Sequence, residues 1–129
     1  METKFNFKSQ PYTTIEQSQR LIALGLKVET ADCCHWFCIS CVDEPIEGEN
    51  IPAWSLIRLI EMMPNNIHKY NDIADLSVSN ELVQYRFYDV DYNHDVCIEH
   101  FNDGTLFDNI IDCIEWLIKE GYFNKEYLV

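Results

Sequence analysis

The chain has 129 residues, of which 47% are hydrophobic and 24% are charged. This length and balance fit one globular domain, and they exclude a disordered, collagen-like or fibrous protein. Nine Lys and Arg side chains oppose 22 Asp and Glu side chains, which gives a formal net charge of −13. Binding to nucleic-acid phosphates needs clustered cations, so we expect no direct nucleic-acid binding.

The sequence also carries no sign of a membrane span or of secretion. A span needs about 20 consecutive apolar residues, and the apolar runs here are interrupted by charge, as at Ile57-Arg58-Leu59. The first eight residues lack the apolar centre of a signal peptide. We therefore expect a cytoplasmic protein without membrane contact, whose six cysteines are reduced thiols.

The first predicted helix begins at a capping box, Thr13-Thr14-Ile15-Glu16, in which a threonine hydroxyl caps the helix and the glutamate reaches back. It runs to about Leu24, and Gly25 suits the left-handed position that ends a helix. The residues expected on its core face are Ile15, Leu21, Ile22 and Leu24.

Residues 33–42 are apolar on both alternating faces, which predicts a strand covered on both sides with mostly buried thiols. An acidic loop follows at residues 43–50. Ile51-Pro52-Ala53 then begins a second helix, because proline suits the first turn, and Pro64 ends it. Residues 64–75 are expected to form a polar, mobile connection.

Strands are predicted at residues 76–79, 82–88 and 96–101, and residues 89–95 join the last two as a hairpin loop. The final helix has Thr105 as its cap and Gly121 at its end. Its apolar stripe consists of Phe107, Ile110, Ile111, Ile114, Leu117 and Ile118. This element order predicts a single α+β domain over residues 1–129, with three helices packed on one face of a small, mainly antiparallel sheet.

Four segments of the chain form a familiar combination. They are Thr13–Ser18 with Arg20-Leu21, Thr30-Ala31-Asp32, Ile51–Leu56 with Leu59-Ile60-Glu61, and Glu115–Lys119. In these segments the chain resembles a family of small uncharacterised proteins from anaerobic gut bacteria, their phages and their mobile elements. The resemblance covers most of the chain and is most specific at Ile51–Leu56. It implies a single cytoplasmic domain of a mobile element, without an assigned activity, cofactor or catalytic residue.

The cysteine cluster supports three competing chemistries. Cys34-x3-Cys38-x2-Cys41 has the spacing of a radical-SAM iron–sulfur motif, but that chemistry needs a barrel of about 200 residues or more. Zinc is the alternative, with the ligands Cys34, His35, Cys38 and Cys41. A regular strand would divide these ligands between two faces. Cys38 and Cys41 also have redox-pair spacing, although such pairs normally lie at a helix start.

Two further patterns lie near the predicted hairpin. Asp89-x-Asp91-x-Asn93-x-Asp95 resembles the first half of a calcium-binding EF-hand loop. The required glycine is replaced by histidine and the flanks are strands, so a polar hairpin loop is the competing interpretation. Cys97 and His100 form a candidate nucleophile pair, but on a regular strand they point to opposite faces.

Acidic side chains form three groups. Asp108, Asp112 and Glu115 line one side of the final helix at positions i, i+4 and i+7. The other groups are Glu44, Glu47 and Glu49 in the acidic loop, and Asp89, Asp91 and Asp95 in the hairpin loop. Such charge serves solubility first. The functional interpretation of this charge is a surface that binds a basic protein. Such a partner could be a nucleic-acid-binding host protein, which the acidic surface would bind in the way that a DNA mimic does.

The first functional hypothesis is therefore a non-enzymatic interaction or regulatory protein of a mobile element, without a cofactor. Asp108, Asp112 and Glu115 are its candidate partner-binding residues, because one rigid helix presents all three. Exposed aromatic side chains near Tyr122 and Phe123 are the alternative contact surface. The second hypothesis is a small zinc-binding or thiol-dependent enzyme centred on residues 34–41, with Cys34, Cys38 and Cys41 as ligands.

Overall fold

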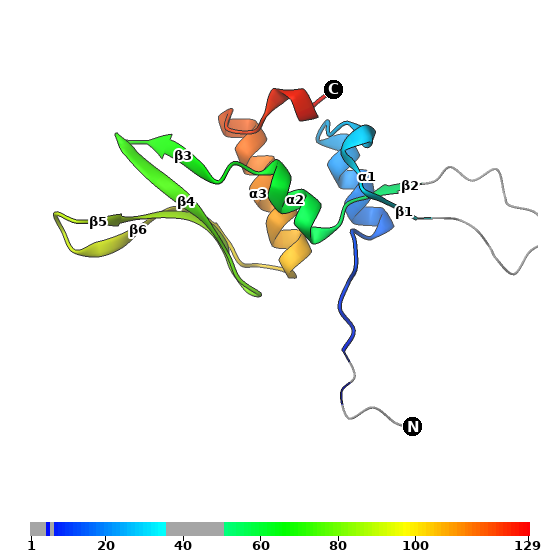
Figure 1. Ribbon diagram of the computed structural model, residues 1–129, viewed down its shortest axis with the longest axis horizontal. Coiled ribbons are helices and arrows are strands. Elements are labelled where there is room, and N and C mark those ends of the chain that lie inside the picture. The colour runs from blue at the N-terminus through cyan, green and yellow to red at the C-terminus, as the bar shows by residue number, and fades with distance from the viewer. Residues whose placement is uncertain (1–4, 6, 36–50) are drawn as a thin grey trace, which may run out of the picture.

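The computed structural model describes residue 5, residues 7–35 and residues 51–129 of the chain (Figure 1). The described residues form three α-helices and two antiparallel sheets, so the predicted α+β class is confirmed. The helices are α1 (Ile15–Ala23), α2 (Leu56–Met62) and α3 (Leu106–Glu120). The smaller sheet pairs β1 (Cys33–His35) with β2 (Ile51–Ala53). The larger sheet has the order β3 (Asn66–Lys69), β4 (Asp72–Val78), β5 (Val83–Asp89) and β6 (His94–Phe101).

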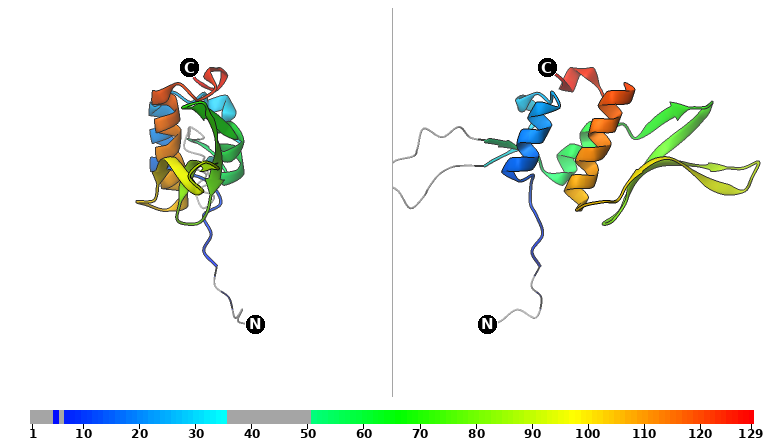
Figure 2. Two further views of the ribbon diagram at one scale, coloured as in Figure 1. Left: turned by 90° about the vertical axis from the view of Figure 1, so that its left-hand side faces the viewer. Right: turned by 180° about the vertical axis from the view of Figure 1, so that it is seen from behind.

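The helices and the four-stranded sheet occupy opposite halves of the molecule (Figure 1, Figure 2). Helix α3 packs against β5 and β6, while α1 packs against α3 and β2, and α2 against α3. The β3–β4 and β5–β6 hairpin turns both point away from the helices. The sheet is therefore covered near its base on one face, and no described helix packs on its other face, which we call the open face.

Helix α1 begins one residue later than predicted. Its N-cap is Thr14, whose hydroxyl accepts the Gln17 N–H, and the Gln17 side chain accepts the Thr14 N–H in return. Thr13 is fully buried instead, and its hydroxyl bonds the Ser18 hydroxyl at 2.7 Å and the Trp54 N–H at 3.0 Å. Since this buried network uses Thr13, the capping role passes to the next threonine. Gly25 has the expected left-handed backbone, with φ of 103°.

The predicted start of the second helix is wrong. Residues Ile51–Ala53 form β2, paired with Cys33–His35, and α2 begins only at Leu56 with Ser55 as its N-cap. Asp32 accepts both the backbone N–H and the hydroxyl of Ser55, which fixes the chain between the strand and the helix. Pro52 is compatible with a helix start and with a short edge strand, because an edge strand also tolerates a missing N–H. The pairing of residues 51–53 with β1 therefore decides that they form a strand.

The predicted mobile connection at residues 64–75 is also wrong, because most of it forms the β3–β4 hairpin. Lys69 pairs with Asp72, and the two residues between them, Tyr70 and Asn71, have φ of 55° and 64°. Two successive left-handed residues are the requirement of a type I′ hairpin turn. Ile67 lies buried on the covered face and anchors the hairpin to the core.

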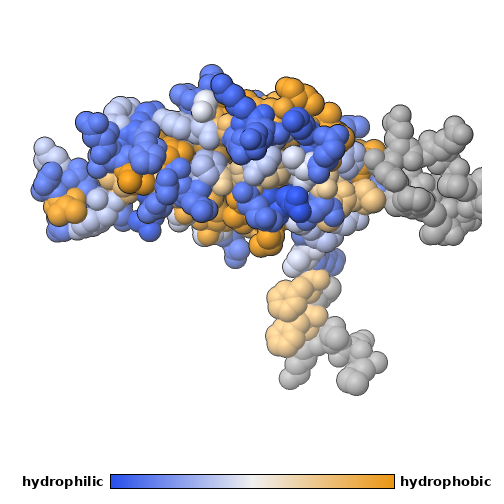
Figure 3. Space-filling model, turned by 45° about the horizontal axis from the view of Figure 1, so that its top comes forward, coloured by the Kyte–Doolittle hydropathy of each residue, from blue (hydrophilic) through white to orange (hydrophobic). Residues whose placement is uncertain are grey.

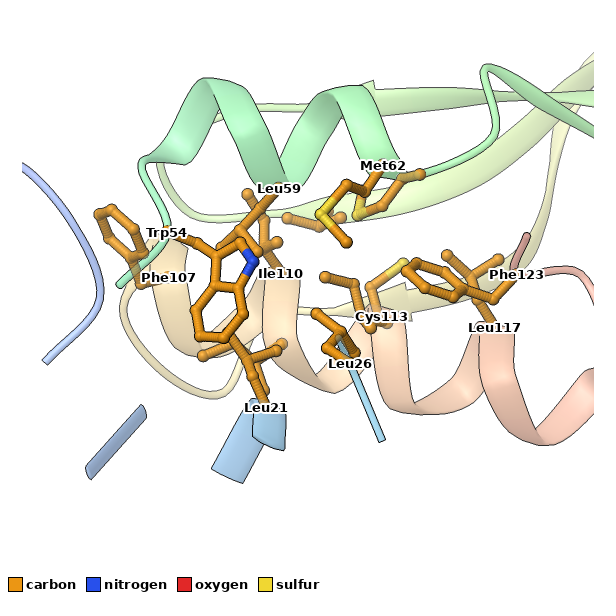
Figure 4. Close-up of a cluster of buried hydrophobic side chains, with 14 of the residues drawn as sticks. Leu21, Leu26, Trp54, Leu59, Met62, Phe107, Ile110, Cys113, Leu117 and Phe123 are labelled. Carbon is orange, nitrogen blue, oxygen red and sulfur yellow. The ribbon is translucent and has the colours of Figure 1, made fainter. Parts of the chain in front are cut away.

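The later elements agree with the sequence. Strands β5 and β6 form a hairpin, and α3 has Thr105 as its N-cap and Gly121 in a left-handed C-cap with φ of 81°. Phe107, Ile110, Ile111, Ile114 and Leu117 are buried as predicted, whereas Ile118 is half-buried. This stripe meets the Trp54 ring and side chains of α1 and α2 in one core (Figure 4).

Three exposure predictions need correction. In β1, Cys33 is half-buried and Cys34 is exposed, so this part of the predicted strand is not covered on both sides. Residues 36–42 lie outside the described residues. On α1, Leu21 is fully buried but Ile22 is 38% exposed, because α1 contacts the core along a narrow stripe. Phe123 is buried and Tyr122 half-buried, since both pack beside the end of α3 rather than forming an exposed aromatic surface.

Candidate interaction surface

The three candidate acids on α3 lie along its contact with α1. Gln17 donates from Nε2 to Oδ1 of Asp108 at 2.7 Å. Arg20 donates from Nη2 to Oδ1 of Asp112 at 2.7 Å and to Oε2 of Glu115 at 2.9 Å. The sequence spacing placed the acids on one side of the helix correctly, but it did not indicate that α1 supplies these partners.

Arg20 supplies one positive charge to a group of three carboxylates. Burial alone would lower the pKa of Arg20, but its hydrogen bonds to Asp112 and Glu115 raise it above the usual value. The guanidinium therefore stays charged. Its side chain is 39% exposed, against 37% for Asp112 and 54% for Glu115, so the pairs are solvent-screened and contribute at most about 1 kcal/mol.

A shallow hollow lies beside Asp112 and Glu115 on the side of the sheet. It measures about 450 Å³, and its lining consists of Phe101, Asp112, Glu115, Trp116 and Lys119. We call these five residues the acidic hollow. The Phe101 and Trp116 ring centroids are 6.2 Å apart, so aromatic surface from β6 and α3 meets two carboxylates there. Two carboxylates outnumber the single ammonium of Lys119 in this lining, and carboxylates beside an aromatic ring can bind a cationic side chain.

A second hollow lies along the same contact, towards the N-terminus of α1. It measures about 570 Å³ and is polar, with a lining that consists of Gln10, Thr14, Glu16, Gln17, Arg20, Thr105 and Asp108. The Arg20 guanidinium is thus flanked by concave surface that a partner can reach. In the view of Figure 3, hydrophobic surface is broken into small patches among hydrophilic side chains.

Two of the three acids of the predicted hairpin loop, Asp89 and Asp95, stabilise the hairpin itself. The Asp89 carboxylate accepts the N–H groups of Asp91 and Tyr92 at 3.0 and 3.3 Å, which is an Asx-type turn. Asp95 accepts from Arg86 at 2.9 Å across the strand pair. Among the described residues, no three His, Cys, Asp or Glu side chains are grouped to hold a metal ion. The geometry therefore favours the polar-loop interpretation over the calcium site.

The cysteine cluster is described only at its first positions. Cys34 is exposed in β1, and the His35 ring bonds the backbone carbonyl of Thr13. Cys38 and Cys41 lie outside the described residues, as do Glu44, Glu47 and Glu49 of the acidic loop. The zinc and redox predictions for residues 34–41 therefore stay predictions.

The expectation that Cys97 and His100 point to opposite faces is wrong. The β5–β6 register shifts between Tyr85 and Arg86, so that Tyr85 pairs with Glu99 while Arg86 pairs with Cys97. One extra residue on β6 forms a β-bulge, which reverses the alternation. The Cys97 Sγ and His100 Nδ1 atoms consequently lie 3.9 Å apart on the open face.

This pair does not have the character of an activated nucleophile. Although Cys97 is exposed, partial loss of water around its sulfur raises the pKa of the thiol, and the nearby Glu99 carboxylate raises it further. Catalytic thiols need a lowered pKa, because the thiolate is the reactive form. No sequence signal indicated the bulge, so the juxtaposition could not be predicted.

Comparison with known proteins found no family model, curated protein or solved structure that matches the chain. In the described part of the chain, no helix combines the length and apolarity that crossing a membrane requires.

Proposed function

We propose that this protein is a non-enzymatic interaction protein that binds a basic protein partner through the acidic side of α3. The observation that carries the proposal is the guanidinium site on α3. Asp112 and Glu115 hold the Arg20 guanidinium at 2.7 and 2.9 Å, and they form the rim of the acidic hollow. A cytoplasmic location and an origin in a mobile element belong to the same proposal.

Each carboxylate keeps one oxygen for a second cation. Arg20 uses Oδ1 of Asp112 and Oε2 of Glu115, and the described residues provide no hydrogen bond to the other oxygen of either group. An arginine of the partner that entered the acidic hollow would come beside both carboxylates and the Trp116 ring. Arginine is favoured over lysine for this role, because its planar guanidinium binds carboxylates bidentately and stacks on aromatic rings.

Charge on the rest of the chain supports the same partner chemistry. A formal charge of −13 attracts a basic protein over a distance of about one Debye length, which speeds association at low salt. Long-range attraction does not determine where on the surface the partner binds, however. The acidic hollow adds the carboxylates of Asp112 and Glu115 and an aromatic surface, and we expect specificity to come from these.

The test compares two double variants that remove the same charge. Asp112→Asn with Glu115→Gln should weaken binding of a fluorescent hexa-arginine peptide at least about tenfold, which corresponds to about 1.4 kcal/mol. Asp72→Asn with Asp91→Asn removes two exposed carboxylates from the hairpin turns. This control should weaken binding less than about threefold, as expected for the loss of screened, long-range attraction alone. Equal weakening by both double variants would contradict the proposal.

The second hypothesis, a zinc-binding or thiol-dependent enzyme at residues 34–41, has no described geometry in its favour, since Cys38 and Cys41 lie outside the described residues. It stays a prediction. Metal analysis of the purified protein tests it separately, because the arginine proposal requires no metal.

A further inference from the structure

The open face of the four-stranded sheet carries a thiol and an imidazole in chelating geometry. Cys97 and His100 are both exposed, and their Sγ and Nδ1 atoms are 3.9 Å apart. Zinc bonds of about 2.3 Å to sulfur and 2.0–2.1 Å to nitrogen, at the tetrahedral angle, place the two ligand atoms about 3.6 Å apart. A shift of a few tenths of an ångström therefore brings both atoms onto one metal ion.

The pair owes its geometry to the β-bulge in β6. Without the extra residue, Cys97 and His100 would lie on opposite faces, as alternation requires. Bulges often re-aim side chains at functional sites. Glu99, whose carboxylate accepts the His100 N–H at 3.1 Å, adds negative charge next to the pair. The positive charge of Arg86, which pairs with Cys97 across the strands, is offset by its ion pair with Asp95.

We propose that Cys97 and His100 form half of a zinc site, which the same two residues of a second copy of this chain complete. The described residues of one chain offer two ligands here, whereas a closed zinc site takes four, commonly two cysteines and two histidines. No group of three or more His, Cys, Asp or Glu side chains in the described ranges could complete the site within one chain. The second copy therefore supplies the missing pair.

The open sheet face gives a second copy room to approach. Packed sheets lie about 10 Å apart, so a metal ion midway is about 5 Å from each sheet, within reach of a cysteine and a histidine side chain. Each Cys97 thiol releases its proton to solvent on binding, and two thiolates neutralise Zn²⁺. Two chains of charge −13 repel each other, so dimer formation depends on the metal.

The experiment uses a full-length variant with Cys34→Ser, Cys38→Ser and Cys41→Ser, which removes the thiols of the competing cluster. Sedimentation velocity should show a monomer in EDTA and a dimer after EDTA is removed and Zn²⁺ is added, with one zinc ion for two chains. Adding Cys97→Ser or His100→Ala should abolish the dimer. His94→Ala, which removes another exposed histidine of β6, should retain it.

Spectroscopy identifies the ligand directly. Co²⁺ in place of zinc should give a thiolate-to-metal absorption band in the triple variant, and Cys97→Ser should remove it while circular dichroism shows an unchanged fold. Four outcomes would overturn the proposal: a monomer in the presence of zinc, one zinc ion per chain, a dimer that persists in EDTA, or a zinc-dependent dimer that survives Cys97→Ser.

Discussion

The two faces of the four-stranded sheet come from the same strands but have different roles. On the covered face, Val83 and Tyr85 are fully buried against α3, and the Tyr85 hydroxyl donates to the Pro64 carbonyl at 2.7 Å. On the open face, Arg86 and Tyr88, which alternate with them, are exposed. The difference shows that stability is concentrated on one face, while side chains on the other can change or bind without disturbing the core.

The largest expected effect comes from a matched pair of tyrosines in β5. Tyr85→Ala removes a fully buried ring and should lower the free energy of unfolding by about 3–5 kcal/mol. Tyr88→Ala, three positions along the strand, removes a ring that is 53% exposed and should change it by less than about 0.5 kcal/mol. Urea denaturation of both variants measures these values. Similar losses in the two variants would disprove the assignment of stability to the covered face.

A second prediction concerns Cys113, which is fully buried on α3. Burial raises the pKa of its thiol to about 12, and the charges of Glu99 and Asp112 add to this effect. The unfolded thiol titrates near 9, so between these values the unfolded state releases a proton that the native state keeps. Stability must therefore fall as pH rises through this window, by up to about 1.4 kcal/mol per pH unit.

The measurement compares the wild type with Cys113→Ala by urea denaturation at pH 8.5 and pH 10. The wild type should lose about 1 kcal/mol more than the variant between the two conditions, because the variant lacks the titrating thiol. Equal losses would show that the Cys113 thiol titrates normally and is reached by solvent.

Only a small effect on stability is expected at Arg20. Arg20→Gln removes two solvent-screened ion pairs and should lower the free energy of unfolding by no more than about 1 kcal/mol. Arg86→Gln, which breaks the exposed pair with Asp95, is the matched control and should behave alike. The two variants should differ in binding, because only Arg20→Gln frees carboxylate oxygens beside the acidic hollow. Hexa-arginine should therefore bind more tightly to Arg20→Gln, and weaker binding would mean that Arg20 takes part in recognition.

The sequence was most informative where the signals are local. Helix α3 was predicted with its cap, its stripe and its terminal glycine, since all of these lie within one continuous segment. Strand β2 was missed because Pro52 suits either a helix start or an edge strand, and the deciding pairing with β1 spans the chain from Cys33 to Ala53. The β3–β4 turn was missed because Tyr70 and Asn71 occupy left-handed positions that sequence patterns usually assign to glycine.

In the candidate site, too, the sequence predicted what depends on local spacing and missed what depends on distant residues. Spacing along one helix was enough to group Asp108, Asp112 and Glu115. Their partner Arg20 is 92 residues from Asp112, and the Phe101 ring arrives from β6, so neither could be derived from local pattern. The Cys97–His100 pair depends on one extra residue in a strand, and a bulge of this kind leaves no distinctive residue in the sequence.

The central claim, that the acidic hollow recognises arginine, is tested most directly by two-dimensional ¹H–¹⁵N NMR during titration of the wild type with hexa-arginine. The account predicts shifts of the Trp116 indole N–H and of the Asp112 and Glu115 amides. The fully buried Trp54 indole and the Asp91 amide in the hairpin loop should stay unchanged. Shifts concentrated in the hairpin loop, or spread evenly over all acidic residues, would contradict the claim.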